Sequence, residues 1–432
     1  MKRVIVFLIM VALIAGMMGC IPAPSFELEI RDWHDLDAVR HNLTGHHRLM
    51  NDLDSTSVGY EELASPIANQ GRGWLPIGDT DNRFSGRFSG EDHEIRDLFI
   101  DRPDEGPVGL FGVVDLGVIH GVGATNATVT GDRWVGSLAG YVQRGAVSYS
   151  YFSGNVTGDT QIGGLVGRND GGRVENSDAA GNVTGDWFVG GLVGVNDGIV
   201  TNSGSTASVS GEEGVGGLAG YNSAGTVNNS HSAGMVVGRL SVGGLVGLIE
   251  DEGTVTNSTS TARVTGSELV GGLVGGNLKG TVSKCDSAGV VIGEQAIGGL
   301  VGFNTGTVAE AYSTSSVSGS SHVGGLVGWN DGGSVENSYA AGNVTANQAA
   351  GGLVGWNEEG TVSNSFWDMQ TSGTEESDGG TGKTTVQMQS IATFAEAGWD
   401  ITAVAAGVSN RACVWNIVDG QTYPFLSWQP VS

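Results

Sequence analysis

Gly190-Gly191-Leu192-Val193-Gly194 is one copy of a pentapeptide that decides how most of this chain folds. The pentapeptide, or a one-letter variant of it, returns at intervals of 26 to 28 residues. Its copies begin at Gly136, Gly163, Gly190, Gly216, Gly243, Gly271, Gly298, Gly324 and Gly351, and residues 109–112 form a degenerate forerunner. A fixed period of this length indicates one structural unit that is stacked many times.

Each repeat unit has the composition of short strands joined by tight turns. In residues 190–216, three β-prone pieces alternate with turns rich in Gly, Asn, Asp and Ser. A single three-strand coil cannot bury its apolar side chains, whereas stacked coils pair each strand in parallel with its counterparts above and below. We therefore predict an all-β fold, a right-handed parallel β-helix (β-solenoid) with about 27 residues per three-strand coil.

Two valine columns are predicted to line the interior, because β-branched side chains suit a pleated surface. They are Val174, Val200, Val227, Val255, Val282, Val308, Val335 and Val362 in the second piece, and Val156, Val183, Val209, Val236, Val264, Val291, Val317 and Val344 in the third.

A corner of the unit is predicted to carry a ladder of asparagines, each amide hydrogen-bonded to the same residue one coil away. The column comprises Asn169, Asn196, Asn222, Asn277, Asn304, Asn330 and Asn357. Ile249 interrupts it, so we expect an irregular corner there. Cys285 takes a slot that serine fills in most other units, which predicts a small buried residue rather than part of a disulfide framework.

The ends of the chain have separate predicted roles. Residues 1–20 predict an export signal, and Met17-Met18-Gly19-Cys20 resembles a bacterial lipoprotein processing box. That resemblance implies a lipid on Cys20, with simple cleavage and release as the alternative. Residues 21–60 are predicted to be a linker and an N-terminal capping helix. Residues 61–365 are assigned to the β-solenoid, with the repeats at 109–365, and residues 366–432 to a C-terminal linker and a cap over the far end.

The repeat also resembles a known family. The pentapeptide followed by Thr-Val-x-Asn-Ser, as at residues 351–365, resembles the GLUG-motif repeat family, and residues 366–368 with 379–384 resemble a terminal segment common in its surface proteins. The resemblance covers about residues 74–428. It implies an extracellular, adhesin-like β-solenoid and brings no catalytic constellation with it.

Charge and residue pattern limit the chemistry. The formal net charge of −26 disfavours nucleic acid as a partner, because phosphate binding needs clustered Lys and Arg. Asp170, Asp197 and Asp331 could hold calcium, but their Asn-Asp-Gly context favours plain turns. Four histidines between residues 34 and 47 are interpreted as surface residues rather than metal ligands. We expect no metal site, no cofactor and no catalytic residue.

One variable column carries the candidate binding residues. It follows the Leu-Val-Gly run and becomes aromatic in three consecutive coils, at Phe303, Trp329 and Trp356. Facing outward, this strip could hold sugar rings, and facing inward it would be core. The glycines make the strand alternation ambiguous, and core is the favoured interpretation.

The leading functional hypothesis is a non-enzymatic, surface-anchored solenoid for adhesion, with surface glycans or envelope polymers as partners. It would be extracytoplasmic, either held at the membrane by a lipid on Cys20 or secreted. The alternative is a polysaccharide-cleaving β-helix enzyme, which would need several carboxylates and a basic residue arranged in a groove.

Overall fold

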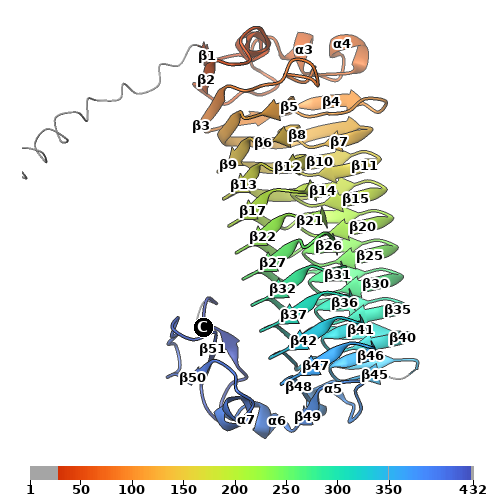
Figure 1. Cartoon of the computed structure of the whole chain (residues 1–432). Helices are drawn as coiled ribbons and strands as arrows, with labels where there is room; N and C mark the ends of the chain where they lie inside the picture. Colours follow the sequence, from red (N-terminus) through yellow and green to blue (C-terminus); the bar gives the residue numbers. More distant parts are fainter. Residues whose placement is uncertain (1–27, 349, 430–432) are drawn as a thin grey trace, which may run out of the picture.

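The computed structural model describes residues 28–348 and 350–429 and shows a long stack of coils between two capping regions (Figure 1). Strands of successive coils pair in parallel, and equivalent residues of the repeat lie side by side, as Val200 does with Val227. The predicted all-β parallel solenoid is confirmed.

One coil, residues 187–210, contains five short strands rather than the expected three. They are β15 (Trp187–Gly190), β16 (Val193–Asn196), β17 (Ile199–Thr201), β18 (Gly204–Ser205) and β19 (Ser208–Ser210). The strand number differs from the prediction because the pentapeptide forms the turn between β15 and β16, and because the last predicted piece is interrupted. The five positions nevertheless join into three long sheets.

Two of these sheets lie on either side of the pentapeptide turn. The nine-stranded sheet contains β7 (Arg133–Val135), β11 (Thr160–Gly163), β15, β20 (Glu213–Gly216), β25 (Leu240–Gly243), β30 (Glu268–Gly271), β35 (Gln295–Gly298), β40 (Ser321–Gly324) and β45 (Ala350–Gly351). The ten-stranded sheet contains β5 (Phe111–Asp115), β8 (Ala139–Gln143), β12 (Val166–Asp170), β16, β21 (Ala219–Asn222), β26 (Val246–Ile249), β31 (Val274–Asn277), β36 (Val301–Asn304), β41 (Val327–Asp331) and β46 (Val354–Glu358). The other strand positions merge into a third sheet of 30 strands.

Close backbone packing explains the glycines of the pentapeptide. A Cβ on Gly190 would lie 2.0 Å from the carbonyl oxygen of Val193, and one on Gly194 would lie 2.5 Å from the backbone of Gln161 in the preceding coil. Any side chain at these places would push the two sheets apart. The tight turn and the contact between sheets therefore both require glycine, once per coil.

The interior is lined as predicted. Both valine columns are buried, except that Val362 in the last coil is partly exposed. Cys285 occupies its slot fully buried, and burial raises the pKa of its thiol. It is a free cysteine, so its predicted role as a small interior residue is confirmed.

The asparagine ladder is present. Nδ2 of Asn169 donates to Oδ1 of Asn196 at 2.8 Å, and equivalent bonds run from Asn196 to Asn222 and from Asn277 through Asn304 and Asn330 to Asn357. Ile249 breaks the ladder as expected. The Oδ1 atoms of Asn169 and Asn277 lack a hydrogen-bond partner, because the preceding coils offer Val142 and Ile249 in place of an amide.

The N-terminal region covers the first coils (Figure 1). Its elements are β1 (Leu28–Ile30), α2 (Trp33–Ala38), the 3-10 turn η1 (Val39–His41), β2 (His46–Leu49), α3 (Tyr60–Leu63), α4 (Ala68–Gly71), β3 (Arg87–Arg96) and β4 (Phe99–Arg102). Asp32 caps α2 by accepting the N–H of Asp35 at 2.9 Å. Trp33 is fully buried against Trp74, 5.8 Å between ring centroids. The predicted short capping helix is confirmed as α2.

The far end of the solenoid is closed by residues 366–383. These include β48 (Phe366–Asp368), α5 (Met369–Ser372) and β49 (Thr381–Lys383). Between α5 and β49, the carbonyl of Glu376 accepts the N–H of Gly352 at 2.8 Å, and the N–H of Asp378 donates to the carbonyl of Val354 at 3.0 Å. This segment pairs with the backbone of the last full coil.

The remaining tail, residues 385–429, folds back along the side of the solenoid instead of covering its end (Figure 1). This C-terminal module contains α6 (Thr385–Met388), α7 (Ile391–Glu396), β50 (Ile401–Ala403), β51 (Trp415–Ile417) and β52 (Phe425–Leu426). Its core is completed by Tyr339 and Phe366, which project from the third sheet. The prediction that this tail covers the end was wrong, because an aromatic column on the side of the solenoid supplies the surface that its own apolar residues need.

Candidate functional site

The aromatic strip faces outward, so its favoured interpretation as core was wrong. Trp356 is 46% exposed, and Phe303 and Trp329 are partly exposed. In β41, Val327 and Asn330 are both fully buried although they are three residues apart. Gly328 between them has no partner in the register with the next coil, so it shifts the alternation by one residue. That shift turns Trp329 outward.

A histidine joins the strip. The rings of Phe303 and Trp329 meet edge to face with centroids 5.2 Å apart. His322 lies 5.6 Å from Trp329 and 5.7 Å from Trp356, measured between ring centroids. The indole Nε1 of Trp329 and Nδ1 of His322 have no hydrogen-bond partner within the protein. Both atoms are themselves buried, so the cluster offers a ligand ring faces and edges rather than these two polar groups.

His322 belongs to a second outward column, which runs beside the first. Its members precede the Val-Gly-Gly or Ile-Gly-Gly of most units and all have positive φ: Trp134, Gln161, Phe188, Gly214, Ser241, Leu269, Ala296 and His322. Trp134 stacks on Tyr141 at 5.4 Å and Phe188 on Tyr221 at 4.9 Å, so the two columns are in contact across neighbouring sheets. The surface between the two columns is called the groove below.

The sequence pattern did not identify this second column as functional. In the sequence, the second column appears only as a variable residue at one fixed place beside the repeated glycines. That pattern can be recognised as part of a surface only once the neighbouring column is known to face outward. The backbone conformation at that place, with φ of 51° at His322, favours Gly, Asn, Asp and His, yet Trp, Gln, Phe, Ser, Leu and Ala also occupy it, so the residue types give no clear signal.

The middle of the groove is hollowed and acidic. A cavity of about 390 Å³ is lined in part by Arg168, Asp197, Glu213, Tyr221 and Glu250. Arg168 is paired with Asp197 at 2.6 Å, and burial raises the pKa of this aspartate despite the arginine. Tyr221 donates its hydroxyl hydrogen to Glu250 at 2.7 Å. Burial, followed by this hydrogen bond, raises the pKa of Tyr221 to about 12, so the phenol remains a hydrogen-bond donor.

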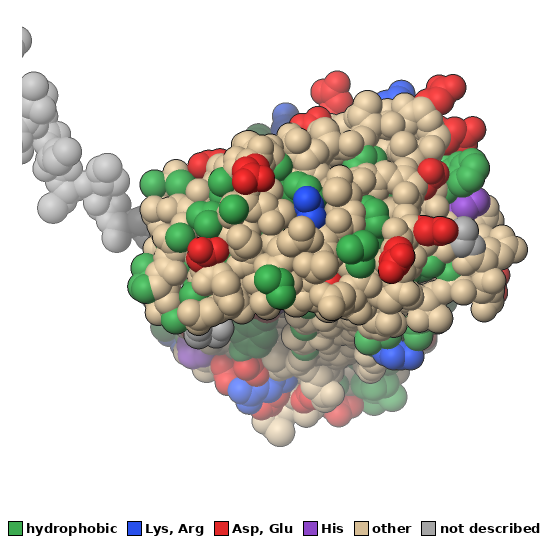
Figure 2. Space-filling model, turned by 90° about the horizontal axis from the view of Figure 1, so that it is seen from below, with side chains coloured by type: hydrophobic (Ala, Val, Ile, Leu, Met, Phe, Trp, Pro, Cys, Tyr) green, Lys and Arg blue, Asp and Glu red, His purple; other side chains and the backbone are tan. Residues whose placement is uncertain are grey.

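The C-terminal end of the groove is also acidic. A cavity of about 450 Å³ beside Trp356 is lined by Trp367, Glu375, Glu376 and Asp378, among others. Figure 2 shows acidic side chains spread over this end of the molecule, with few basic ones. An exposed indole next to several carboxylates is a surface suited to a ligand that has apolar faces and many hydroxyl donors.

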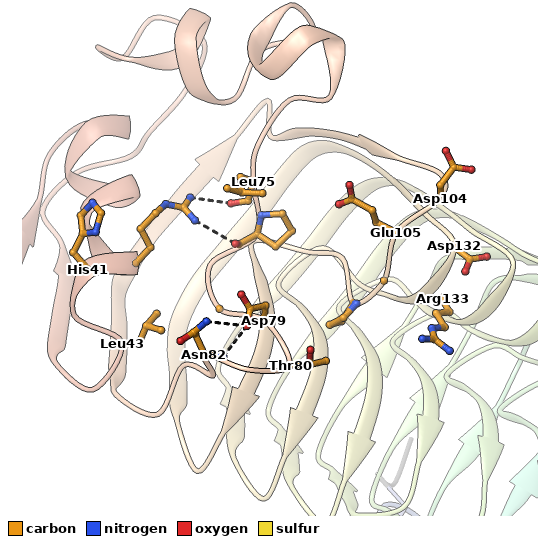
Figure 3. Close-up of a pocket in the computed structure, with 15 residues that line it drawn as sticks. His41, Leu43, Leu75, Asp79, Thr80, Asn82, Asp104, Glu105, Asp132 and Arg133 are labelled. Atoms are coloured by element: carbon orange, nitrogen blue, oxygen red, sulfur yellow. Dashed lines mark hydrogen bonds between the residues drawn. The ribbon is translucent and has the colours of Figure 1, made fainter.

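A cavity of about 650 Å³ near the N-terminal region is the next candidate (Figure 3). Arg40 donates to the carbonyl oxygens of Leu75 at 3.0 Å and Pro76 at 3.3 Å. Oδ1 of Asp79 accepts the backbone N–H groups of Asp81 and Asn82. These polar groups hold the loops that line the cavity in place, so we assign them a structural role.

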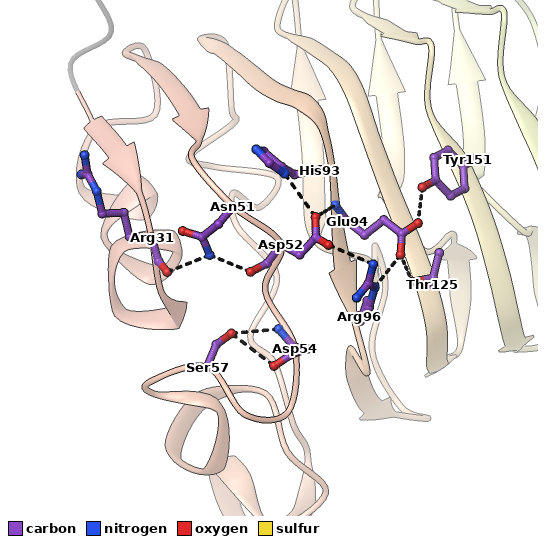
Figure 4. A network of polar contacts seen from close by, with 10 residues as sticks. All are labelled: Arg31, Asn51, Asp52, Asp54, Ser57, His93, Glu94, Arg96, Thr125 and Tyr151. Carbon is purple, nitrogen blue, oxygen red and sulfur yellow. Dashed lines mark hydrogen bonds and ion pairs between the residues drawn. The ribbon is translucent and has the colours of Figure 1, made fainter.

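A polar network ties the N-terminal region to the first coils (Figure 4). Asp52 contacts His93 at 3.2 Å and Arg96 at 2.9 Å, and Glu94 accepts hydrogen bonds from Arg96 and Tyr151. Burial, then the hydrogen bond to Glu94, raises the pKa of Tyr151 to about 12. A tyrosine so held does not serve as a base near neutral pH, and the carboxylates are engaged by neighbours. The network is therefore structural in character.

A buried carboxyl lies where the C-terminal module meets the solenoid. Asp286 accepts hydrogen bonds from Nε2 of Gln429 at 2.9 Å and from Thr259 at 3.0 Å. Burial raises the pKa of Asp286 to about 6. Tyr312 stacks on Tyr339 beside it, at 5.0 Å and nearly parallel. These contacts hold the module against the third sheet.

The described residues hold neither a cluster of metal ligands nor a helix that could span a membrane. Within residues 28–348 and 350–429, no three or more His, Cys, Asp or Glu side chains are placed to hold a metal ion. Asp170, one of the calcium candidates, accepts the hydroxyl of Tyr141, and Asp197 pairs with Arg168. No helix among the described residues is long and apolar enough to cross a bilayer. Cys20 lies outside them, so its lipidation stays a prediction.

The fold and groove define a parallel β-solenoid repeat protein, and comparison identifies the repeat. A family model described as "The GLUG motif" matches residues 158–184, 238–265 and 319–345. The chain is therefore a carrier of GLUG repeats, as the resemblance of its sequence implied.

Two curated relatives match about a quarter of the chain each. Halomucin of Haloquadratum walsbyi is 36% identical over 124 residues, which is 27% of this chain and 1% of halomucin. A "Putative Gly-rich membrane protein" of Evansella cellulosilytica is 37% identical over 111 residues, 24% of this chain and 12% of that protein. The chain thus spans a small part of the length of these relatives. A crystal structure of "a putative immunoglobulin A1 protease" from Bacteroides ovatus aligns over 93% of this chain and 92% of that one, with 17% identity and a TM-score of 0.33.

Proposed function

We propose that this protein is an exported, non-enzymatic surface solenoid that mediates adhesion by binding carbohydrate in the groove. The observation that carries the proposal is the outward strip of Phe303, Trp329 and Trp356, with His322 against it. Exposed aromatic rings in a row are costly to leave in water unless a partner covers them, and sugars present apolar faces of matching size. The names of the two relatives, a mucin and a membrane protein, support a surface location.

Binding is favoured over cleavage by the state of the acidic groups. Acid and base catalysis on a glycosidic bond needs a carboxyl held ready to give a proton and a second group to act on the opposite side. In the groove, burial raises the pKa of Asp197, but this carboxylate is held by Arg168 at 2.6 Å, and Glu250 accepts from Tyr221. These carboxylates position side chains and are suited to accept hydrogen bonds from sugar hydroxyls.

The decisive experiment compares Trp329→Ala and Trp356→Ala with a matched control, Tyr149→Ala. Tyr149 is 58% exposed and lies in the bend between β9 (Ala146–Ser148) and β10 (Tyr151–Thr157), two strands of the third sheet, away from the groove. Each tryptophan variant is expected to lose at least tenfold in retention on a glycan array, about 1.4 kcal/mol, while circular dichroism and melting remain those of the parent. Unchanged retention in both variants, or release of reducing ends from polysaccharide by the parent, would refute the proposal.

The anchoring part of the proposal concerns Cys20. A lipid there would hold the solenoid at the cell envelope with the groove exposed. Replacing Cys20 by Ser should release the protein into the medium and abolish labelling by radioactive palmitate. A parent protein that carries no label and is found in the medium would indicate cleavage and secretion instead.

A further inference from the structure

The groove carries aromatic residues at three levels rather than one. Tyr141 with Trp134 forms the first station, Tyr221 with Phe188 the second, and Phe303 with Trp329, His322 and Trp356 the third. Within the first column, Tyr141, Tyr221 and Phe303 are separated by three coils each: the intervening members are Arg168 and Val195, then Leu248 and Gly276. At about 4.8 Å per coil, successive stations lie about 14 Å apart.

Most positions between the stations are low; the exceptions are Arg168 and Gln161 between the first two stations and Leu269 between the second and third. Val195 is 2% exposed and Leu248 8% exposed, and Gly276 has no side chain. In the second column, Gly214, Ser241 and Ala296 are small. A ligand that runs along the groove would touch rings at the stations, Arg168 and Gln161 between the first two stations, and mostly small side chains or backbone between the second and third.

The spacing selects the shape of the ligand. In an extended β-linked polysaccharide, each pyranose ring advances the chain by nearly the rise of one coil, so about three sugars lie between one station and the next. A straight chain keeps its rings in step with all three stations. A strongly coiled or densely branched glycan would leave the groove after one station.

The charge of the groove selects the chemistry of the ligand. Arg168 is neutralised by Asp197, whereas Glu213 and Glu250 line the middle cavity and Glu375, Glu376 and Asp378 line the cavity beside Trp356. Uronates or sulfated sugars would meet carboxylates at both places, at a cost in affinity. Uncharged sugars would instead donate hydroxyl hydrogen bonds to the same groups.

Resting on the proposed carbohydrate binding, we propose that the ligand is an uncharged, linear, β-linked polysaccharide that lies along the solenoid axis and is held at all three stations. Binding at linked stations makes the second and third contacts intramolecular, so affinity for a long chain exceeds affinity for a fragment.

The test titrates the purified protein with uncharged β-linked oligosaccharides of two to ten sugars, and with oligogalacturonates of equal length. Affinity is expected to rise at least a hundredfold from the disaccharide to chains that span the stations, and then to level off. Oligogalacturonates are expected to bind at least tenfold more weakly than uncharged chains of equal length.

Variants locate the effect. Tyr221→Ala removes the ring of the middle station, at a column position that Val195 and Gly276 show can hold small residues. It should weaken binding of the longest chain at least tenfold and change disaccharide binding less than threefold. Tyr149→Ala should change neither.

Two kinds of failure are distinguishable. If short and long chains bind equally, if oligogalacturonates bind best, or if Tyr221→Ala leaves long-chain affinity unchanged, the axial polysaccharide is overturned while carbohydrate binding stands. If the glycan array is blank and the strip instead retains a protein, both proposals fall.

Discussion

The asparagine ladder makes a quantitative prediction about stability, and Asn304 is the residue that tests it. Asn304 is fully buried, accepts a hydrogen bond from Asn277 at 2.8 Å and donates one to Asn330 at 2.8 Å. Asn304→Ala removes both bonds at once. It also leaves Oδ1 of Asn330 buried without a donor, the situation that Asn169 and Asn277 already show where the ladder starts.

The expected loss is about 3 kcal/mol: about 1 kcal/mol for each of two hydrogen bonds and about 1 kcal/mol for the orphaned acceptor. Asn357→Ala is the matched control at the end of the ladder. Asn357 is partly exposed, and its loss leaves Asn330 bonded to the carbonyl of Gly333 at 3.1 Å. Water can replace the missing partner there, so the control should lose about 1 kcal/mol or less.

Native-state hydrogen exchange followed by mass spectrometry is the suitable assay. A solenoid is stabilised by interfaces between neighbouring coils, so a single global unfolding free energy need not report a local defect. Exchange in residues 297–336 should accelerate roughly a hundredfold in Asn304→Ala and at most about fivefold in Asn357→Ala. These factors follow from the two expected losses of stability, because about 1.4 kcal/mol corresponds to a tenfold change in an equilibrium constant. Equal acceleration in the two variants would refute the ladder as a source of stability.

Three further outcomes are expected. Gly298→Ala should abolish soluble expression or lower the melting temperature sharply, because the new Cβ would lie 1.9 Å from the carbonyl oxygen of Val301. The control Gly276→Ala, whose new Cβ meets only side-chain atoms, should melt like the parent. Equal melting temperatures of the two variants would contradict the packing argument. Since burial raises the pKa of Asp286 to about 6, the folded protein holds a proton that the unfolded chain releases between about pH 4 and 6, so docking of the C-terminal module should weaken as pH rises through that window. Asp286→Asn should remove this dependence in limited proteolysis at pH 4.5 and 7.5, and an unchanged pH profile would count against it. Cys285→Ser should alter the free energy of unfolding by less than about 1 kcal/mol, because serine fills the same slot in other coils. In the parent protein, a thiol reagent should modify Cys413 readily and Cys285 only after unfolding. Rapid modification of both cysteines would disprove the burial of Cys285.

The solenoid was predictable because its information is local and repeated. Every unit places glycine, valine and asparagine at fixed offsets. Stacking one coil on another packs the glycines, buries the valines and pairs the asparagine amides, so the valine columns, the ladder and its break at Ile249 were all confirmed. The candidate strip was found by the same reasoning, but its direction was not. Gly328 in β41 shifts the alternation, and because the equivalent glycine does the same in the neighbouring coil the register is unchanged and the sequence pattern does not reveal it.

The sequence by itself determined the period, the parallel stacking and the identity of the lining residues, because these follow from which side chains recur every coil. Only the tertiary structure decided which way the aromatic column faces, that Trp134, Phe188 and His322 stand beside it, and that residues 385–429 fold back onto Tyr339. Those outcomes depend on contacts between sheets and between segments far apart in the chain. Such contacts are set by backbone geometry and by complementary apolar surfaces, which no single repeat unit contains.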